Sequence, residues 1–445
     1  MRYKDLPDPH QNTLPSGIPY IIANEAAERF SYYGMRAILV VFMTQYMADS
    51  AGQLAVISEQ EAQGYFHLFV SAVYFTPLLG ALVSDGILGK YRTIILLSSF
   101  YCLGHLALAI DNTLMGLLLG QSLIALGAGG IKPCVSAHVG DQFGKYNQHL
   151  IGKVFSWFYF SINLGAFAAM LISPWLLHHY GPSVAFAVPG VLMLAATLVF
   201  WSGRYQFVHI KPAGTGFIKE MLSQHGRNAL AKLASVYVFI AVFWALFEQI
   251  GSSWILQAQK MDRVILGVEL LPSQIQAANP LLIMLLTPLF TYILYPFLNN
   301  LFDLTAIRKM AIGLFLTVIA FAIAAIIQVQ LDQGAATGIV WQLIAHLVLT
   351  SAEVMISITC LDFSYRQAPK TMLSFVMAFY FLSIAVGNLF TSAVNFFIHN
   401  ADGTSKLPGA SYFWFFTILM LVTTALFVRT SSHFQENNHF PHDRN

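Results

Sequence analysis

The sequence GRYQFVHIKPAGTGFIKEMLSQHGRN, residues 203–228, is the longest polar interruption in an otherwise strongly apolar chain. Of the 445 residues, 57% are hydrophobic and only 10% are charged, and the mean hydropathy is +0.63. Soluble proteins carry about 25% charged residues, so this chain has too few polar side chains to cover its surface in water. The composition therefore predicts an integral membrane protein.

Twelve apolar stretches are each long enough to cross a bilayer as a helix, which takes about 20 residues. Six precede the polar interruption and six follow it. We therefore expect an all-α integral membrane protein with twelve transmembrane helices in two six-helix bundles, the arrangement of the major facilitator fold. The stretches are 18–47, 62–85, 92–110, 114–137, 152–175, 184–202, 229–257, 273–298, 306–329, 338–361, 371–397 and 411–429. Three prolines should bend the eighth helix, namely Pro280, Pro288 and Pro296.

The same pattern gives the expected domain boundaries. We expect an N-terminal six-helix bundle over 1–203, a cytoplasmic linker over 204–228, a C-terminal six-helix bundle over 229–430 and a cytoplasmic tail over 431–445. The polar, proline-rich start of the chain lacks the apolar segment of a cleavable signal peptide.

The distribution of Lys and Arg predicts the orientation in the membrane. With the N-terminus inside, 17 of the 23 basic residues fall in inner segments and only 3 in outer loops. Basic residues concentrate on the cytoplasmic side, so both termini should be cytoplasmic. The outer three are Lys260, Arg263 and Lys406, and the remaining 3 lie within helices.

Seven ionisable side chains fall inside the predicted membrane spans. Insertion scales put the cost of a central charge at about 2.5–3.5 kcal/mol each, so these groups must pair, take up protons or face water. Either they form an ion-pair network that only locks the helices together, or they line a path for substrate and ions. Their spread over four helices favours the path. They are Glu25, Glu28, Arg29, Arg36, Lys132, Glu248 and Glu353.

The segment NEAAERFSYYGMR, 24–36, holds four of these charges on one face of the first helix. At 100° per residue its charged and phenolic side chains share a stripe about 140° wide, which cannot face lipid. The stripe consists of Glu25, Glu28, Arg29, Tyr32, Tyr33 and Arg36.

A lone lysine lies deep in the fourth helix, in GAGGIKPCVSAHVGDQF, 127–143. The glycines before Lys132 should allow a neighbouring helix to approach closely. The lysine could hold an anionic group or reach up to the lipid headgroups. Its distance from the polar pair Gly140-Asp141 favours the first interpretation.

Nothing in the sequence indicates an enzyme or a channel. There is no HExxH, GxSxG or P-loop motif and no selectivity-filter loop, so we expect no catalytic residues, no metal site and no cofactor. A net charge of +2 gives no reason to expect nucleic acid as a partner. The three cysteines, Cys102, Cys134 and Cys360, lie in apolar segments without CxxC spacing and are expected to be core residues.

Four motifs in both halves resemble the signatures of the proton-coupled oligopeptide transporter (POT/PTR) family of the major facilitator superfamily. They are ExxERFxYYG (25–34), GGIKPCVSAxxGDQF (129–143), FYFSINLG (158–165) and FWALFEQIGSSW (243–254). The loop GALVSDGILGKYR (80–92) is similar to the superfamily loop signature, with Gly86 where a basic residue is common. The resemblance implies a proton-coupled symporter that imports di- and tripeptides by alternating access.

The resemblance also implies roles for individual residues in peptide binding. Arg29, Tyr33 and Lys132 would hold the peptide carboxylate, and Glu353 would bind the amino terminus. The remaining positions would contact the backbone or line the pocket, namely Tyr32, Tyr74, Asn163, Trp244, Asn279, Ser357 and Tyr380. The alternatives are a proton-coupled transporter of another small anion, such as nitrate, or a membrane protein that does not transport. An anion transporter would not need Glu353, so this glutamate favours peptides.

Proton coupling would involve Glu25 and Glu28 beside Arg29, with a salt bridge from Arg36 to Glu248 as a gate between the halves. His67 occupies a position that resembles the proton-linked histidine of animal members, or it is a hydrogen-bonded histidine without a role in transport. Some bacterial members carry two adjacent carboxylates on helix seven, where this chain has Phe247 before Glu248.

The resemblance further implies the surroundings of the protein. The loop near 330–337 is too short for the extracellular domain of animal members, which indicates a bacterial inner membrane. The expected partners are peptides, protons and the lipid bilayer, with a monomer as the working unit.

Overall fold

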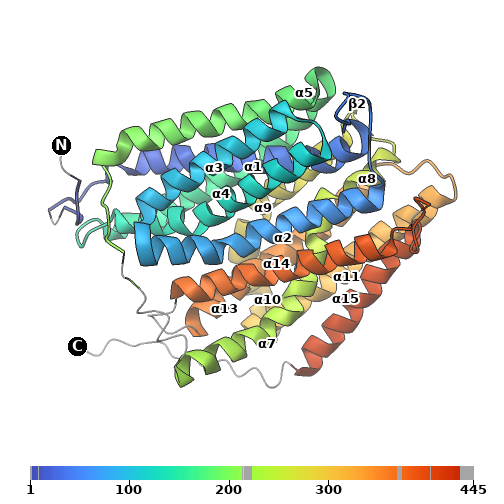
Figure 1. Cartoon of the computed structure of the whole chain (residues 1–445). Coiled ribbons are helices and arrows are strands. Elements are labelled where there is room, and N and C mark those ends of the chain that lie inside the picture. The colour runs from blue at the N-terminus through green and yellow to red at the C-terminus, as the bar shows by residue number, and fades with distance from the viewer. Residues whose placement is uncertain are drawn as a thin grey trace.

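The structure is a computed structural model, and it describes residues 3–8, 10–212, 214, 223–367, 373–400 and 402–430. The predicted tail, 431–445, and part of the predicted linker, 213 and 215–222, lie outside these residues. Long helices run side by side along one direction (Figure 1). We call the end where α1 begins the terminal end, and the end that carries the two short strands the hairpin end.

The first half of the chain forms five long helices. Gly181, with φ of 80°, breaks the last of them, so that α5 crosses the molecule twice. Ser58 begins α2 with a capping box in which its side chain and that of Glu61 satisfy each other's backbone N–H groups. The elements are α1 (Ile18–Gln45), α2 (Glu59–Val83) with the π-helical turn η1 (Ser84–Leu88), α3 (Lys90–Ile110), α4 (Leu114–Asp141), η2 (Gln148–Leu150), α5 (Ile151–Ser202) and η3 (Gly203–Tyr205).

Helices in the second half are interrupted more often. The crossing segments are α7 (Gln224–Phe247) with η4 (Glu248–Gly251) and α8 (Ser253–Gln259); η5 (Pro272–Ala277) with α9 (Ala278–Leu289), η6 (Phe290–Leu294) and α10 (Tyr295–Leu301); α11 (Ala306–Asp332); α12 (Val340–Glu353) with η7 (Val354–Ile358) and α13 (Thr359–Gln367); α14 (Leu373–Ile398); and α15 (Ala410–Thr430). Regular α-helix gives way at Glu248 to a 3₁₀ turn and after Glu353 to a π-helical turn. Two of the predicted charges thus lie where the helix geometry changes.

Eleven helical segments of the described chain are long and apolar enough to cross a membrane. The exception is α1, because its 18-residue windows hold at least three charged side chains: the first contains Glu25, Glu28 and Arg29, and the last contains Glu28, Arg29 and Arg36. With α1 as the twelfth, the predicted all-helical membrane fold with twelve helices is confirmed. The eighth crossing is interrupted by η6, a π-helical segment between Pro288 and Pro296.

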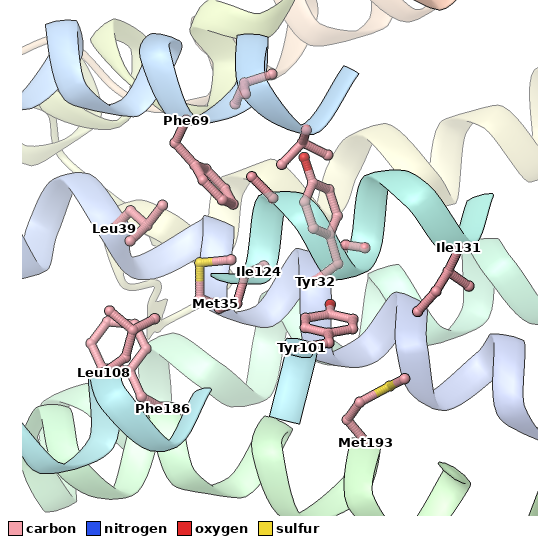
Figure 2. Close-up of a cluster of buried hydrophobic side chains, with 14 of the residues drawn as sticks. Tyr32, Met35, Leu39, Phe69, Tyr101, Leu108, Ile124, Ile131, Phe186 and Met193 are labelled. Atoms are coloured by element: carbon pink, nitrogen blue, oxygen red, sulfur yellow. The ribbon is translucent and has the colours of Figure 1, made fainter. Parts of the chain in front are cut away.

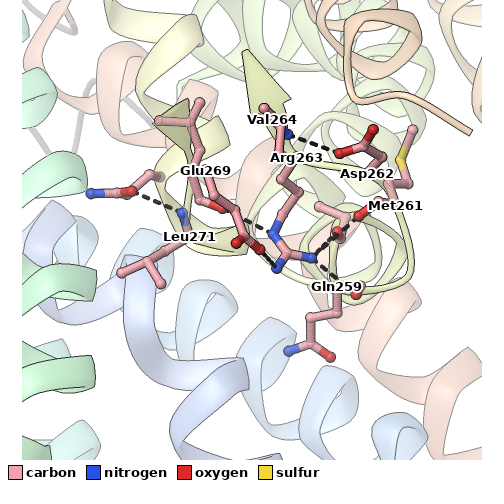
Figure 3. A network of polar contacts seen from close by, with 10 residues as sticks. Gln259, Met261, Asp262, Arg263, Val264, Glu269 and Leu271 are labelled. Atoms are coloured by element: carbon pink, nitrogen blue, oxygen red, sulfur yellow. Dashed lines mark hydrogen bonds and ion pairs between the residues drawn. The ribbon is translucent and has the colours of Figure 1, made fainter. Parts of the chain in front are cut away.

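A small β-hairpin connects α8 to η5. Strand β1 (Val264–Ile265) pairs antiparallel with β2 (Val268–Glu269), and both turn residues, Leu266 and Gly267, have positive φ. Two-residue hairpins favour such turns because their twist matches that of the strands. Arg263 fixes this loop by donating to the carbonyls of Leu270 (2.9 Å) and Ala258 (3.2 Å) and by an ion pair with Glu269 (2.8 Å) (Figure 3).

Each half has its own large hydrophobic core. In the first half, buried side chains of α1 to α5 form this core. Figure 2 shows Tyr32 and Met35 of α1, Phe69 of α2 and Tyr101 of α3 among them. The second core runs from Leu233 to Phe427. Helix α2 packs on α14, and α5 packs on α9 and η5, so the halves meet along two seams.

Glycines bring α2 and α4 together beside Lys132, which confirms the predicted close approach. A Cβ on Gly80 would lie 2.6 Å from the Cα of Gly130, too close for any side chain. Backbone contact at this level places Lys132, two residues further along α4, beside α2.

Candidate functional site between the two halves

Arg29 lies between two carboxylates on its own helix. Its Nε is 2.7 Å from Oε1 of Glu25 and 3.2 Å from Oε2 of Glu28, and both glutamates are buried. Only the Glu25 contact has hydrogen-bond geometry, and the two carboxylate oxygens of Glu28 have no hydrogen-bond partner in the described chain. The arginine is therefore more firmly held by Glu25 than by Glu28.

Arg36 and Glu248 join the two halves in a buried ion pair. The guanidinium lies over the ring of Phe66, 5.5 Å from its centroid. A Cβ on Gly251 would be 2.5 Å from that ring and 3.3 Å from Nη2 of Arg36, so glycine leaves room for the pair.

Lys132 lies between two aromatic rings instead of beside a carboxylate. Its Nζ is 4.4 Å from the ring centroid of Tyr32 and 4.2 Å from that of Tyr74. Cation–π contacts of this kind stabilise a cation without neutralising it. Lys132 forms no ion pair with any described carboxylate, so its charge remains available to a ligand.

Glu353 in the second half is a carboxylate without an ion-pair partner in the described chain, as Lys132 in the first half is a cation without one. Its Oε2 accepts a hydrogen bond from Nδ2 of Asn279 (2.8 Å), which also donates to Oγ1 of Thr350 (3.2 Å). Ser357 donates to the main-chain carbonyl of Glu353 (2.8 Å). No described cation forms an ion pair with Glu353, so this carboxylate has amide and not charge partners.

His67 is buried between the halves and is bonded at both ring nitrogens. Nδ1 is 2.8 Å from Oδ1 of Asn388, and Nε2 is 2.8 Å from Oγ of Ser252. The Asn388 amide is oriented by its own bond to the carbonyl of Ile384 (3.0 Å), so Oδ1 faces His67 and Nδ1 is the protonated nitrogen. The Ser252 hydroxyl can then donate to Nε2 of the neutral ring or accept from the charged ring.

Among the remaining predicted residues, the aromatic ones contact other aromatic rings, whereas Asn163 bonds only within its own helix in the described chain. Trp244 and Tyr380 pack edge to face with centroids 6.5 Å apart, and Tyr74 reaches Phe381 of the other half at 6.0 Å. Tyr33 packs against Tyr32 at 5.2 Å. Asn163 instead donates to the carbonyl of Tyr159 in its own helix (2.9 Å) and has no described contact with the other candidates.

Other bonds between the halves gather near the hairpin end. Ser71 donates to the carbonyl of Ala385 (2.8 Å) and Ser392 donates to that of Gly64 (2.8 Å). Two glutamines of η5 donate to the first half, Gln274 to the carbonyl of Leu171 (2.9 Å) and Gln276 to that of Ala37 (3.3 Å). An ion pair of Lys260 with Glu59 (3.3 Å) lies at the rim.

Several of these partners carry no sequence signal. They are single polar residues in apolar or loop segments, namely Asn388, Ser252, Thr350 and the two glutamines of η5. Only the packed structure reveals which groups they bond. In the described part of the chain, no group of three or more His, Cys, Asp or Glu side chains could hold a metal ion. Its three cysteines are free.

The fold is that of an integral membrane protein in which two helical halves meet along charged side chains. Comparison with known proteins identifies the family of the chain. A family model described as the POT family matches residues 91–224 and 217–415. The Drosophila melanogaster protein called peptide transporter family 1 is 36% identical over 368 residues, covering 72% of this chain and 48% of that protein. Human solute carrier family 15 member 1 is 35% identical over 380 residues, covering 72% and 52%.

Solved structures extend the similarity to almost the whole chain. The crystal structure of the POT family transporter PepTSo superposes with a TM-score of 0.84 at 34% identity, covering 96% of this chain and 100% of that chain. An auto-inhibited POT family peptide transporter gives 0.84 at 32% identity, covering 96% and 98%.

The chain belongs to the POT family of proton-dependent oligopeptide transporters, within the major facilitator superfamily. This confirms the family that the motifs indicated, which is a family of transporters and not of enzymes. The chain spans about half the length of the curated relatives that it matches.

Proposed function

We propose that this protein is a proton-coupled symporter that imports di- and tripeptides by alternating access. The observation that carries the proposal is the pair of unneutralised charges in opposite halves, Lys132 in the first and Glu353 in the second. A short peptide is a zwitterion, so its carboxylate suits the lysine and its ammonium suits the glutamate. The names of the relatives, which include peptide transporters, support the same substrate class.

The net charge of the ionisable side chains within the spans supports coupling to a proton. Three cations and four carboxylates lie within the spans, so the fully ionised set carries one net negative charge. A zwitterionic peptide adds no net charge, and one bound proton makes the loaded site neutral. Moving a neutral set between two membrane faces avoids the cost of carrying a net charge through a low-dielectric interior.

Within the cluster we assign the exchange of partners to Arg29. In this proposal a proton neutralises Glu28, whose oxygens have no hydrogen-bond partner in the described chain, and Arg29 then turns to the peptide carboxylate with Tyr33. Release of the proton re-forms the ion pair and frees the peptide. Glu25 keeps Arg29 in place, and His67 adds a second titratable group between the halves.

The remaining candidates would complete the binding pocket. Asn279 orients Glu353, and Asn163 would contact the peptide backbone. Aromatic walls accept varied side chains without specific hydrogen bonds, which suits a transporter of many peptides. These walls would be Tyr32, Tyr74, Trp244 and Tyr380, with Ser357 beside them.

Alternating access would move residues 1–203 against 229–430, with 204–228 as the linker. Arg36–Glu248 and the bonds near the hairpin end would close that end while the site opens at the terminal end. The distribution of Lys and Arg supports cytoplasmic termini, so the hairpin end would face outward. We further propose a bacterial inner membrane location and a monomer as the working unit.

The deciding experiment is uptake of labelled dialanine into proteoliposomes with an inward proton gradient. We expect accumulation that a protonophore abolishes and that unlabelled tripeptide competes away. No accumulation, or accumulation unaffected by the protonophore, would contradict the proposal. Uptake of labelled nitrate under the same gradient tests the alternative function, transport of a small anion. Arg29 and Lys132 could bind such an anion, but Glu353 would not be needed for it.

A further inference from the structure

A second concentration of basic side chains lies away from the central site, at the terminal end. There a cavity of about 350 Å³ is enclosed by the start of the chain, the turn before α3, one residue of α4 and the segment that follows η3. Its lining holds three cations and two histidines against one carboxylate, namely Lys90, Arg92, Lys211, His138 and His209 against Asp5.

The segments around this cavity are fixed by specific contacts. The backbone N–H of His209 donates to the carbonyl of Lys4 (2.7 Å), and the N–H of Val208 donates to Oε1 of Gln142 (2.9 Å). The His209 ring lies 4.4 Å from the ring of Tyr3 and 4.7 Å from that of Tyr91. The cavity is therefore a built feature and not a gap beneath a loose loop.

One buried side chain on the cavity lacks a partner. His138 is 1% exposed, and its Nε2 has no hydrogen-bond partner in the described chain. Its ring is packed between Phe200 and Phe207, with centroids 5.9 and 5.2 Å away. Nε2 itself has no solvent access, so His138 forms part of the wall of the cavity and is not in reach of a group bound there.

The start of α3 contributes further donors. Gly89, its N-cap, supplies no side-chain acceptor, and the first turn holds no acidic residue, although Gly89, Lys90, Tyr91 and Arg92 all line the cavity. Uncapped amides at a helix N-terminus and the positive end of its dipole favour anions. Lys90 is paired with Asp141 at 2.7 Å, whereas Arg92 has no described ion-pair partner.

We propose that this cavity binds a phosphate group, held by Arg92, Lys211 and the first amides of α3. A tetrahedral phosphate offers enough acceptor oxygens for donors that converge from several elements, and two cations suit its charge better than that of a carboxylate. Ile87 and Ile210 line the same cavity and are 69% and 41% exposed. A phospholipid could therefore present the phosphate with its acyl chains along these side chains, or a soluble phosphate could enter alone.

The test uses the full-length protein in detergent and follows its melting temperature at constant ionic strength. One arm adds inorganic phosphate and the other adds phosphatidylglycerol, with chloride and a neutral-headgroup, phosphate-free lipid as the respective controls. Arg92→Gln/Lys211→Gln removes the two lining cations that have no ion-pair partner in the described part of the chain. Lys145→Gln/Lys153→Gln is the matched control, because both of its lysines are exposed and neither lines the cavity.

We expect at least one arm to stabilise the wild type and the control variant alike, with an affinity at least about tenfold weaker in the Arg92/Lys211 variant. Stabilisation by both additives indicates a site for the phosphate group from either source, and stabilisation by phosphatidylglycerol alone indicates a lipid site. No stabilisation in either arm, or equal weakening in both double variants, would overturn the proposal. Uptake of dialanine is not the readout, so the result does not depend on the proposed transport function.

Discussion

Arg36 of α1 and Glu248, the first residue of η4, form a buried ion pair across the two halves, although 212 residues separate them in the chain. Removing one member of a buried pair leaves an uncompensated charge and costs about 3–5 kcal/mol. We therefore expect Arg36→Gln and Glu248→Gln each to lower the melting temperature and to reduce gradient-driven dialanine uptake at least about tenfold.

The reversed pair Arg36→Glu/Glu248→Arg is the control for this prediction. If the bond between halves is what matters, the reversal should recover part of both the stability and the uptake. A reversed variant as inactive as the single variants, but as stable as the wild type, would show that Arg36 or Glu248 serves transport in another way.

Glu353→Gln should weaken peptide binding while the protein still inserts and folds. The amide keeps the shape of the side chain but loses the charge that suits a peptide ammonium, and hydrogen bonds to charged groups contribute about 1.5–3 kcal/mol. We expect the KM for dialanine to rise roughly tenfold or more. Glu61→Gln, a partly exposed carboxylate near the hairpin end, is the control and should leave the KM unchanged.

Glu28→Gln should separate proton coupling from peptide binding. A permanently neutral side chain at this position mimics the protonated state, so gradient-driven uptake should fall at least about tenfold while exchange of labelled for unlabelled dialanine persists. Glu25 has a hydrogen bond to Arg29 that Glu28 lacks, so Glu25→Gln should impair exchange as well. Equal driven uptake in Glu28→Gln and the wild type would remove Glu28 from the coupling step.

Ser252→Ala should affect transport only through His67. Losing one hydrogen bond of about 1 kcal/mol should lower uptake about fivefold in the wild-type background. In a His67→Asn background the same change should have little further effect, because the bonded ring is already gone. Additive losses in the double variant would mean that Ser252 and His67 act separately.

Gly80→Ala should destabilise the first half by disturbing the contact of α2 with α4. The new Cβ would meet the backbone of Gly130, which cannot move like a side chain, and overpacking costs about 1–3 kcal/mol. Gly86→Ala is the matched control, since nothing lies within 4 Å of its Cβ position. A melting temperature that falls equally in both variants would contradict the proposed contact.

The sequence predicts the twelve helices well because a bilayer imposes one length and one composition on each crossing. It also identifies the seven charged side chains inside the spans, since charge inside an apolar span is conspicuous. Residues such as Asn388 and Ser252 could not be found in this way. Their contact with His67 depends on how α2 lies against α14 and η4. Asn388 is 321 positions from His67 and Ser252 is 185 positions from it, so no local sequence pattern links them. The hairpin at 264–269 is too short for periodicity to distinguish from a loop.

Several side chains of one half donate hydrogen bonds to main-chain carbonyls of the other half. This arrangement limits how the residues of the interface can change in evolution. Ser71, Gln274 and Gln276 donate to the carbonyls of Ala385, Leu171 and Ala37, and a carbonyl is present whatever side chain the residue carries. The donors are therefore constrained while the acceptors can change identity wherever packing allows. Comparison of many related sequences should show fixed residues on one side of each bond and no correlated substitutions on the other, so that covariation would miss these contacts.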